Sequence, residues 1–113
     1  MKLYLLSIYL VPSHGPENVS STEVNYTTFG ITWAALSEKV ARGIIKMYQV
    51  RLFLKENCTS AQSELYSRFN TTTTNMVLSG LSICAKYEVS IRGYTAVGPG
   101  PYSRAIILQT LSK

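Results

Sequence analysis

Short runs of alternating apolar and polar residues recur along this chain at intervals of about ten residues, with turn-forming residues between them. The clearest run is 48–55, where Tyr, Val, Leu and Leu alternate with Gln, Arg, Phe and Lys. Such alternation places every second side chain on one face of a strand, so each run predicts a β-strand with one face to bury. No segment shows the apolar periodicity and capping residues of a long helix.

The alternating runs predict seven short strands. They are an edge strand near Val19 and the runs 29–33, 48–55, 65–69, 76–78, 87–92 and 106–109. The polar stretches 37–43 and 56–63 are expected to be loops. Strands of this kind must bury one face against a second sheet, which predicts an all-β chain folded as a seven-stranded antiparallel, immunoglobulin-like β-sandwich. A chain of 113 residues has room for one such domain.

The start of the chain, 1–11, is apolar apart from Lys2. Two interpretations stay open: a short signal-peptide core with Pro12-Ser13 near its cleavage site, or a preceding strand or cloning remnant. The stretch is shorter than the roughly 20 apolar residues of a membrane-spanning helix, so no membrane span is expected. We expect a leading segment over 1–14, the domain over 15–111 and a tail at 112–113.

Four of the five asparagines begin an Asn-x-Ser/Thr sequence, the acceptor for N-linked glycans. This pattern favours an extracellular, glycosylated protein. The alternative is that a Thr-rich composition produces such sequences without use. The four candidate glycosylation sites are Asn18, Asn25, Asn57 and Asn70.

Few residues in this chain are suited to catalysis. The one histidine, His14, lies in the leading segment, the six glutamates fall in separate segments, and there is no aspartate. No nucleophile stands beside a base, and no group of residues has the spacing of metal ligands. The sequence therefore predicts a chain that is not an enzyme and holds no metal or cofactor.

Several further features occur in order along the chain. They are Pro16 before the first strand, Trp33 on the second, Ile45-x-x-Tyr48-x-Val50 on the third, Leu81 followed by Tyr87, and Tyr94 to Ser103 before the last strand. In this order and spacing, over Pro16 to Thr110, the chain resembles the fibronectin type III domain, of the kind found in receptor-type tyrosine phosphatases and cell-adhesion receptors. Each feature alone is weak, and their order makes the resemblance specific.

The resemblance implies structural roles for four residues. Trp33 and Tyr48 are expected to fill the core between the sheets, where large rings provide much of the buried area. Leu81 and Tyr87 match the family's tyrosine corner, with the Tyr87 hydroxyl bonded to backbone.

The resemblance also places Cys58, after the third strand, at the same pole as Cys84, before the sixth. A disulfide between them is expected, and two free thiols are the alternative. A redox site is not expected, because the two cysteines are far apart in sequence.

The net charge of +5 raises the question of an anionic partner. Basic residues expected on outward positions of the third and sixth strands are Lys46, Arg51, Lys55, Lys86 and Arg92. Such a face is a candidate contact for heparan sulfate, although Glu56 and Glu88 lie among these residues and basic side chains often serve only solubility. Nucleic acid is not expected, because the chain has no basic motif rich in aromatic residues.

The resemblance implies a spacer and protein-interaction unit of a larger cell-surface receptor or adhesion protein, with any enzyme domain outside this chain. Other extracellular proteins or neighbouring domains are the expected partners, and the module itself is expected to be a monomer. The Arg-Gly-Asp adhesion signal is absent, and the last loop has Pro-Tyr-Ser-Arg where cytokine receptors carry Trp-Ser-x-Trp-Ser.

Overall fold

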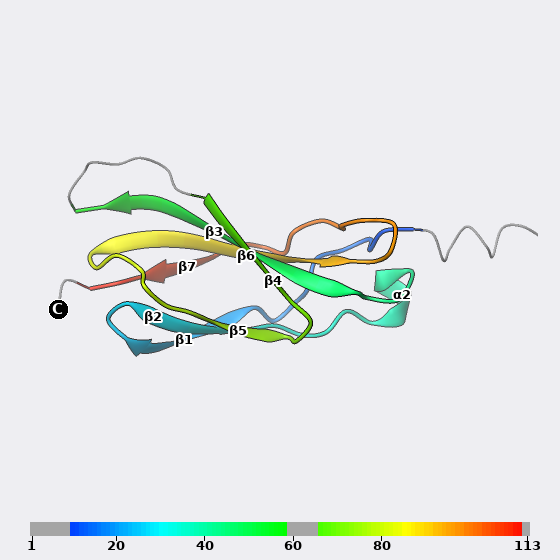
Figure 1. The fold of residues 1–113 in the computed structure, drawn as a ribbon, viewed down its shortest axis with the longest axis horizontal. Helices are drawn as coiled ribbons and strands as arrows, with labels where there is room; N and C mark the ends of the chain where they lie inside the picture. Colours follow the sequence, from blue (N-terminus) through cyan, green and yellow to red (C-terminus); the bar gives the residue numbers. More distant parts are fainter. Residues whose placement is uncertain (1–9, 59–65, 112–113) are drawn as a thin grey trace, which may run out of the picture.

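The computed structural model describes residues 10–58 and 66–111, which form two facing antiparallel sheets (Figure 1). One sheet has the strand order β1-β2-β5, with β1 at Ser20–Asn25, β2 at Thr28–Thr32 and β5 at Asn75–Leu78. The other has the order β4-β3-β6-β7, with β4 at Tyr66–Thr71, β3 at Met47–Asn57, β6 at Ala85–Tyr94 and β7 at Ile106–Gln109. The antiparallel β-sandwich predicted from the alternating pattern is confirmed.

The seven expected strands correspond to the seven observed ones, with shifted ends. β3 is longer than expected and runs through Asn57, whereas a loop was predicted from Glu56. It stays in the sheet because pairing with β6 continues past a register shift between Leu54 and Glu56, up to Asn57 opposite Ala85. Leu65, the first residue of the expected fourth strand, lies outside the described residues. Register and pairing, which decide these ends, depend on the neighbouring strand.

The loop predicted over 37–43 is partly wrong, because Glu38–Ala41 forms a short helix, α2. The Ser37 hydroxyl caps it by accepting a hydrogen bond from the Val40 amide at 3.3 Å. Arg42 ends it in the left-handed conformation, with φ 55°. A single helical turn leaves no repeat in the sequence, so periodicity could not reveal it.

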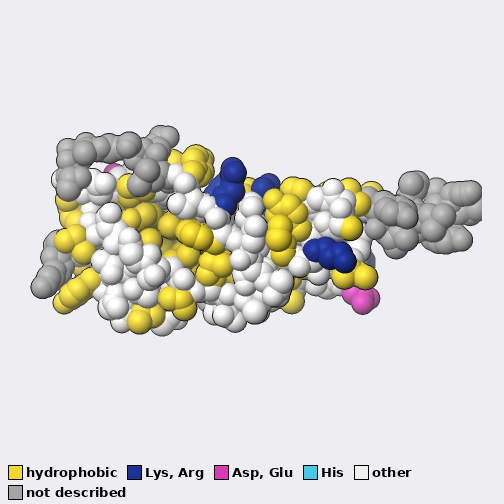
Figure 2. All heavy atoms as spheres, viewed as in Figure 1, with side chains coloured by type: hydrophobic (Ala, Val, Ile, Leu, Met, Phe, Trp, Pro, Cys, Tyr) yellow, Lys and Arg dark blue, Asp and Glu magenta, His cyan; other side chains and the backbone are white. Residues whose placement is uncertain are grey.

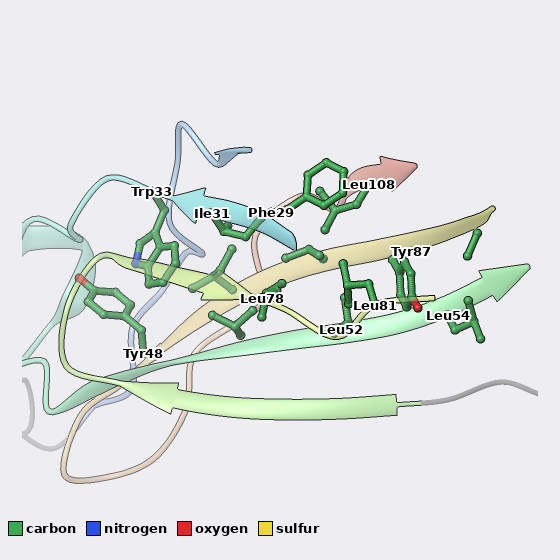
Figure 3. Close-up of a cluster of buried hydrophobic side chains, with 14 residues drawn as sticks. Phe29, Ile31, Trp33, Tyr48, Leu52, Leu54, Leu78, Leu81, Tyr87 and Leu108 are labelled. Carbon is green, nitrogen blue, oxygen red and sulfur yellow. The ribbon is translucent and has the colours of Figure 1, made fainter. Parts of the chain in front are cut away.

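The core lies between the two sheets (Figure 3). Side chains that point inward from both sheets bury their apolar surface there, and Ile31, Val50, Val89 and Ile91 have no exposed area. The four residues expected in the core are all buried: Trp33, Tyr48, Leu81 and Tyr87. Trp33 lies one residue after β2 rather than on it, and its ring packs edge-on against Tyr48 at 5.7 Å between centroids.

Two buried hydroxyl groups hold the pole at which β6 begins. The Tyr87 hydroxyl accepts a hydrogen bond from the Ser82 amide at 2.7 Å, which is the tyrosine-corner geometry. The Thr110 hydroxyl accepts from the Ala85 amide at 2.9 Å and donates to the Ser82 carbonyl at 2.6 Å. These contacts anchor the loop between β5 and β6, because they satisfy the backbone amides of Ser82 and Ala85 and the carbonyl of Ser82 without a strand partner.

A disulfide joins Cys58 to Cys84 at the same pole, with a Cα–Cα distance of 5.6 Å. Cys58 directly follows β3 and Cys84 directly precedes β6, two strands that pair along most of their length. The Cys58 amide also donates to the Cys84 carbonyl at 3.0 Å. The bridge therefore extends the contact between these strands beyond their last paired residues.

The described part of the leading segment, 10–14, packs against the opposite pole. Pro12 is fully buried, and it lies so close to Gly100 that a β-carbon on residue 100 would come within 2.6 Å of the proline ring. The Thr95 hydroxyl donates to the Leu10 carbonyl at 2.8 Å, and the Ser13 amide donates to the Val40 carbonyl at 2.9 Å. These contacts tie the segment to α2 and to the loop that follows β6.

Candidate interaction surface

Neither a metal-binding cluster nor a membrane-spanning helix is found among the described residues. No three His, Cys, Asp or Glu side chains among them come together in a way that would hold a metal ion. Nor does this part of the chain include a helix with the length and apolarity of a membrane span.

One face of the four-stranded sheet points away from the core and carries charged and aromatic side chains from three of its strands. The pairing of β3 with β4 decides which side chains on this face are neighbours: Gln49 lies opposite Asn70, Arg51 opposite Arg68 and Phe53 opposite Tyr66. We call this face the outer face. It comprises Gln49, Arg51, Phe53, Lys55 and Glu56 on β3, Tyr66, Arg68 and Asn70 on β4, and Lys86, Glu88, Ser90, Arg92 and Tyr94 on β6.

Tyr102, from the loop between β6 and β7, lies over the outer face. The guanidinium carbon of Arg51 is 3.8 Å from the centre of its ring, and that of Arg92 is 4.5 Å away. The Tyr102 hydroxyl also donates a hydrogen bond to Gln49 Oε1 at 3.1 Å. Cations held over an aromatic ring are attracted by its π electrons, so Tyr102 positions both arginines.

Gln49 connects these groups and is only 8% exposed although it points outward. Its Oε1 accepts from Nε and Nη2 of Arg92 at 3.0 and 2.8 Å, in addition to Tyr102. Three donors on one oxygen determine the orientation of the amide, so Nε2 must face Asn70. There it donates to Asn70 Oδ1 at 3.1 Å.

Charge is divided unevenly along the outer face. Towards the disulfide, Lys55 pairs with Glu88 at 3.4 Å and Lys86 with Glu56 at 3.5 Å. Towards the other end, Arg51 and Arg68 stand opposite each other, and neither has an acidic partner among the described residues. Like charges directly opposite across a strand pair destabilise the sheet, so this pair is not explained by folding.

The structure changes the set of basic residues expected on this face. Lys55 and Lys86 are already paired with glutamates. Lys46 lies one residue before β3, and the alternation of the strand places it on the same side as buried Tyr48 rather than on the outer face. Arg51 and Arg92 are on the face as expected. Sequence reasoning missed Arg68 and Tyr102, because the first needs the register of β4 and the second a loop's path in space.

The candidate glycosylation sites lie at different places on the surface. Asn18, Asn25 and Asn70 are exposed, whereas Asn57 is partly buried beside Cys58. Asn25 Oδ1 accepts from the Thr27 amide at 3.0 Å. Asn70 offers Oδ1 to Gln49, so its Nδ2, the atom to which a glycan attaches, is the other end of the amide. These positions are compatible with glycans, and occupancy stays a prediction.

A family model described as the fibronectin type III domain matches residues 14–109. Over 99 residues the chain is 32% identical to mouse protein sidekick-1, and the match covers 88% of this chain and 4% of the relative. Over 100 residues it is 27% identical to human cell adhesion molecule DSCAM, covering 88% of this chain and 5% of that one. The chain thus spans about a twentieth of these relatives' length.

The solved structures agree on the fold. The third fibronectin III domain of the human KIAA0343 protein superposes with a TM-score of 0.77 at 22% identity, covering 91% of this chain and 86% of that one. At this identity the likeness concerns the arrangement of the strands alone.

Proposed function

Because this chain belongs to the fibronectin type III domain family, we propose that it is an extracellular spacer and protein-interaction unit of a larger cell-surface adhesion protein. The observation that carries the proposal is the similarity of this chain to a short segment, 4–5% of the length, of much longer relatives. The name of the DSCAM relative favours an adhesion protein as the parent over a receptor-type tyrosine phosphatase. Fold alone does not determine function, so the binding role needs its own test.

The spacer role is supported by the placement of the chain ends. The first and last described residues lie at opposite ends of the long axis of the sandwich (Figure 1). A neighbour joined at each end would therefore be held apart by the length of the domain. The packing of Pro12 and the hydrogen bonds of Leu10 and Ser13 would limit bending at the first junction.

The extracellular location is supported by the disulfide and by the four glycosylation sequences. We expect a mammalian secretory host to release the module as a monomer with N-linked glycans and a Cys58–Cys84 bridge. Mass spectrometry before and after enzymatic removal of N-glycans checks this, and a Thr27→Ala variant should lack only the glycan on Asn25. Secretion with no glycan mass on any of the four sites would contradict the extracellular assignment.

The interaction role is tested by binding to cells. A fluorescent tetramer of the secreted module raises weak affinity through multivalency and is measured by flow cytometry on a panel of mammalian cell lines. We expect binding that trypsin treatment of the cells removes and heparinase treatment leaves intact. Binding that heparinase removes would instead favour heparan sulfate as the partner. Failure to bind any line would overturn the interaction role.

A further inference from the structure

We propose that the arginine-bearing half of the outer face is a docking site for a protein partner that presents carboxylate groups. The site consists of Arg51, Arg68 and Arg92 with Phe53, Tyr66, Tyr94 and Tyr102. The inference rests on the proposed interaction role and adds to it the face and the chemistry of the partner.

The charge of this half is unbalanced. The outer face uses its two glutamates to neutralise Lys55 and Lys86, and none of the described acidic groups pairs with the three arginines. Arg51 and Arg68 face each other across β3 and β4. A carboxylate placed between them would receive charge-assisted hydrogen bonds from both and remove their repulsion. Figure 2 shows Lys and Arg side chains projecting from the upper edge of the molecule, with hydrophobic side chains beside them.

The remaining side chains of the site are those typical of protein interfaces. Phe53 and Tyr66 form a ring pair with centroids 4.7 Å apart, next to Arg51 and Arg68 along their strands. Tyr66 is 60% exposed, a large area for an aromatic residue. Aromatic residues and arginine are enriched in interfaces and at the positions that contribute most to affinity, whereas lysine and glutamate are depleted.

Two of the three arginines, Arg51 and Arg92, are held in place before any partner arrives. Arg92 donates through Nε and Nη2 to Gln49, and through Nη2 to Tyr94 Oη at 3.2 Å. These bonds leave Nη1 of Arg92 without a partner among the described residues. The guanidinium carbon of Arg51 lies over the Tyr102 ring, 3.8 Å from its centre. Restricting these side chains in advance lowers the entropy lost on binding.

A compact acidic protein surface fits this arrangement better than a long sulfated polysaccharide. Glu56 and Glu88 share the outer face with the arginines and neutralise Lys86 and Lys55, so that part of the sheet offers a long polyanion no net positive charge. A protein surface that covers only the arginine-bearing half avoids that part of the sheet. Guanidinium groups also bind carboxylates in a bidentate geometry that lysine does not reproduce, so a carboxylate partner should lose affinity when the arginines are replaced by lysines.

A glycan on Asn70 would begin at the border of this site, since Asn70 is two residues from Arg68 on β4. The test therefore uses a Thr72→Ala background. This change removes the acceptor sequence Asn70-Thr71-Thr72 and keeps Asn70 as the acceptor for Gln49. Thr72 is exposed, so the substitution leaves the core unchanged.

The probe is an immobilised random copolymer of glutamate and tyrosine, which offers carboxylates with aromatic rings, compared with polyglutamate and with heparin. Binding of four secreted proteins is measured by biolayer interferometry. They are the Thr72→Ala background and, within it, R51A/R68A, R51K/R68K and K39A/K46A. The last pair removes the same charge as the alanine pair, from exposed positions on α2 and before β3. Thermal unfolding of each protein shows that the fold is retained.

We expect the background protein to bind the copolymer more tightly than polyglutamate or heparin. Affinity for the copolymer should fall at least about tenfold in R51A/R68A, several-fold in R51K/R68K and less than about twofold in K39A/K46A. A lack of binding by the background protein, equal losses in the two alanine pairs, or tighter binding to heparin that R51K/R68K retains would each overturn the proposal.

The cell-binding assay separates this inference from the function on which it rests. If R51A/R68A still binds cells in the trypsin-sensitive way, the interaction role stands and the partner docks elsewhere. If the module without the arginine substitutions binds no cells, the interaction role itself fails.

Discussion

Replacing Trp33 with alanine is expected to lower the free energy of unfolding by about 3–5 kcal/mol. Trp33 is 5% exposed and is the one tryptophan of the chain. Its ring fills the end of the core next to Tyr48, between the last residues of β2 and the first of β3 (Figure 3). Alanine would leave a cavity there that the two sheets, held by their strand pairing, cannot close.

Trp33→Phe is the matched control, because it keeps a ring at this position and removes the indole N–H. That N–H is buried and has no hydrogen-bond partner among the described residues. The phenylalanine variant therefore loses packing area and no hydrogen bond, and we expect it to cost about 1–2 kcal/mol. Urea unfolding followed by far-UV circular dichroism measures both variants, since tryptophan fluorescence is lost in each. Equal destabilisation by phenylalanine and alanine would contradict this account.

Removing the disulfide is expected to destabilise the domain by about 3 kcal/mol. Cys58 and Cys84 are separated by 26 residues, and the bridge restricts this loop mainly in the unfolded chain. The folded pole keeps its other contacts: the Cys84 amide donates to the Leu111 carbonyl at 3.2 Å, and Thr110 anchors the same loop. The double variant C58A/C84A should therefore fold to the same sandwich with a lower unfolding midpoint.

Reduction of the disulfide in the unsubstituted domain provides the control for this variant. The stability of each protein is measured by chemical denaturation, with and without a reducing agent. The reducing agent should lower the stability of the unsubstituted domain to about that of the double variant, and should leave the double variant unchanged. If the reducing agent left the stability of the unsubstituted domain unchanged, this would contradict a stabilising bridge. Loss of folding in the double variant alone would show that the alanines, rather than the missing bridge, cause the damage.

Strand positions could be predicted because alternation is a local property of the chain. The run 48–55 alternates because one face of β3 enters the core, and the pattern is visible without knowing the neighbouring strand. The end of β3 was placed too early, since residues 56 and 57 continue the strand only through their pairing with β6. The turn of helix at Glu38–Ala41 was missed because it is too short to repeat.

The candidate site could be predicted only in part. That Arg51 and Arg92 lie on the outer face followed from the alternation of their strands. That Lys55 and Lys86 pair with glutamates, whereas the arginines have no acidic partner among the described residues, did not. Whether a basic side chain is already neutralised depends on which residue stands opposite it in the neighbouring strand. Tyr102 belongs to a loop, and no pattern in the sequence says which face of the sheet it covers.

The sequence by itself determined the class of fold and the residues of the core, since these depend on which side chains are present and on their alternation. It also marked the four glycosylation sequences and two cysteines. Only the tertiary structure decided which charges are paired, which arginines share the Tyr102 ring and that Arg51 and Arg68 face each other. The physical reason is that alternation comes from the backbone of one strand, whereas electrostatic pairing comes from the register between strands and the path of a loop.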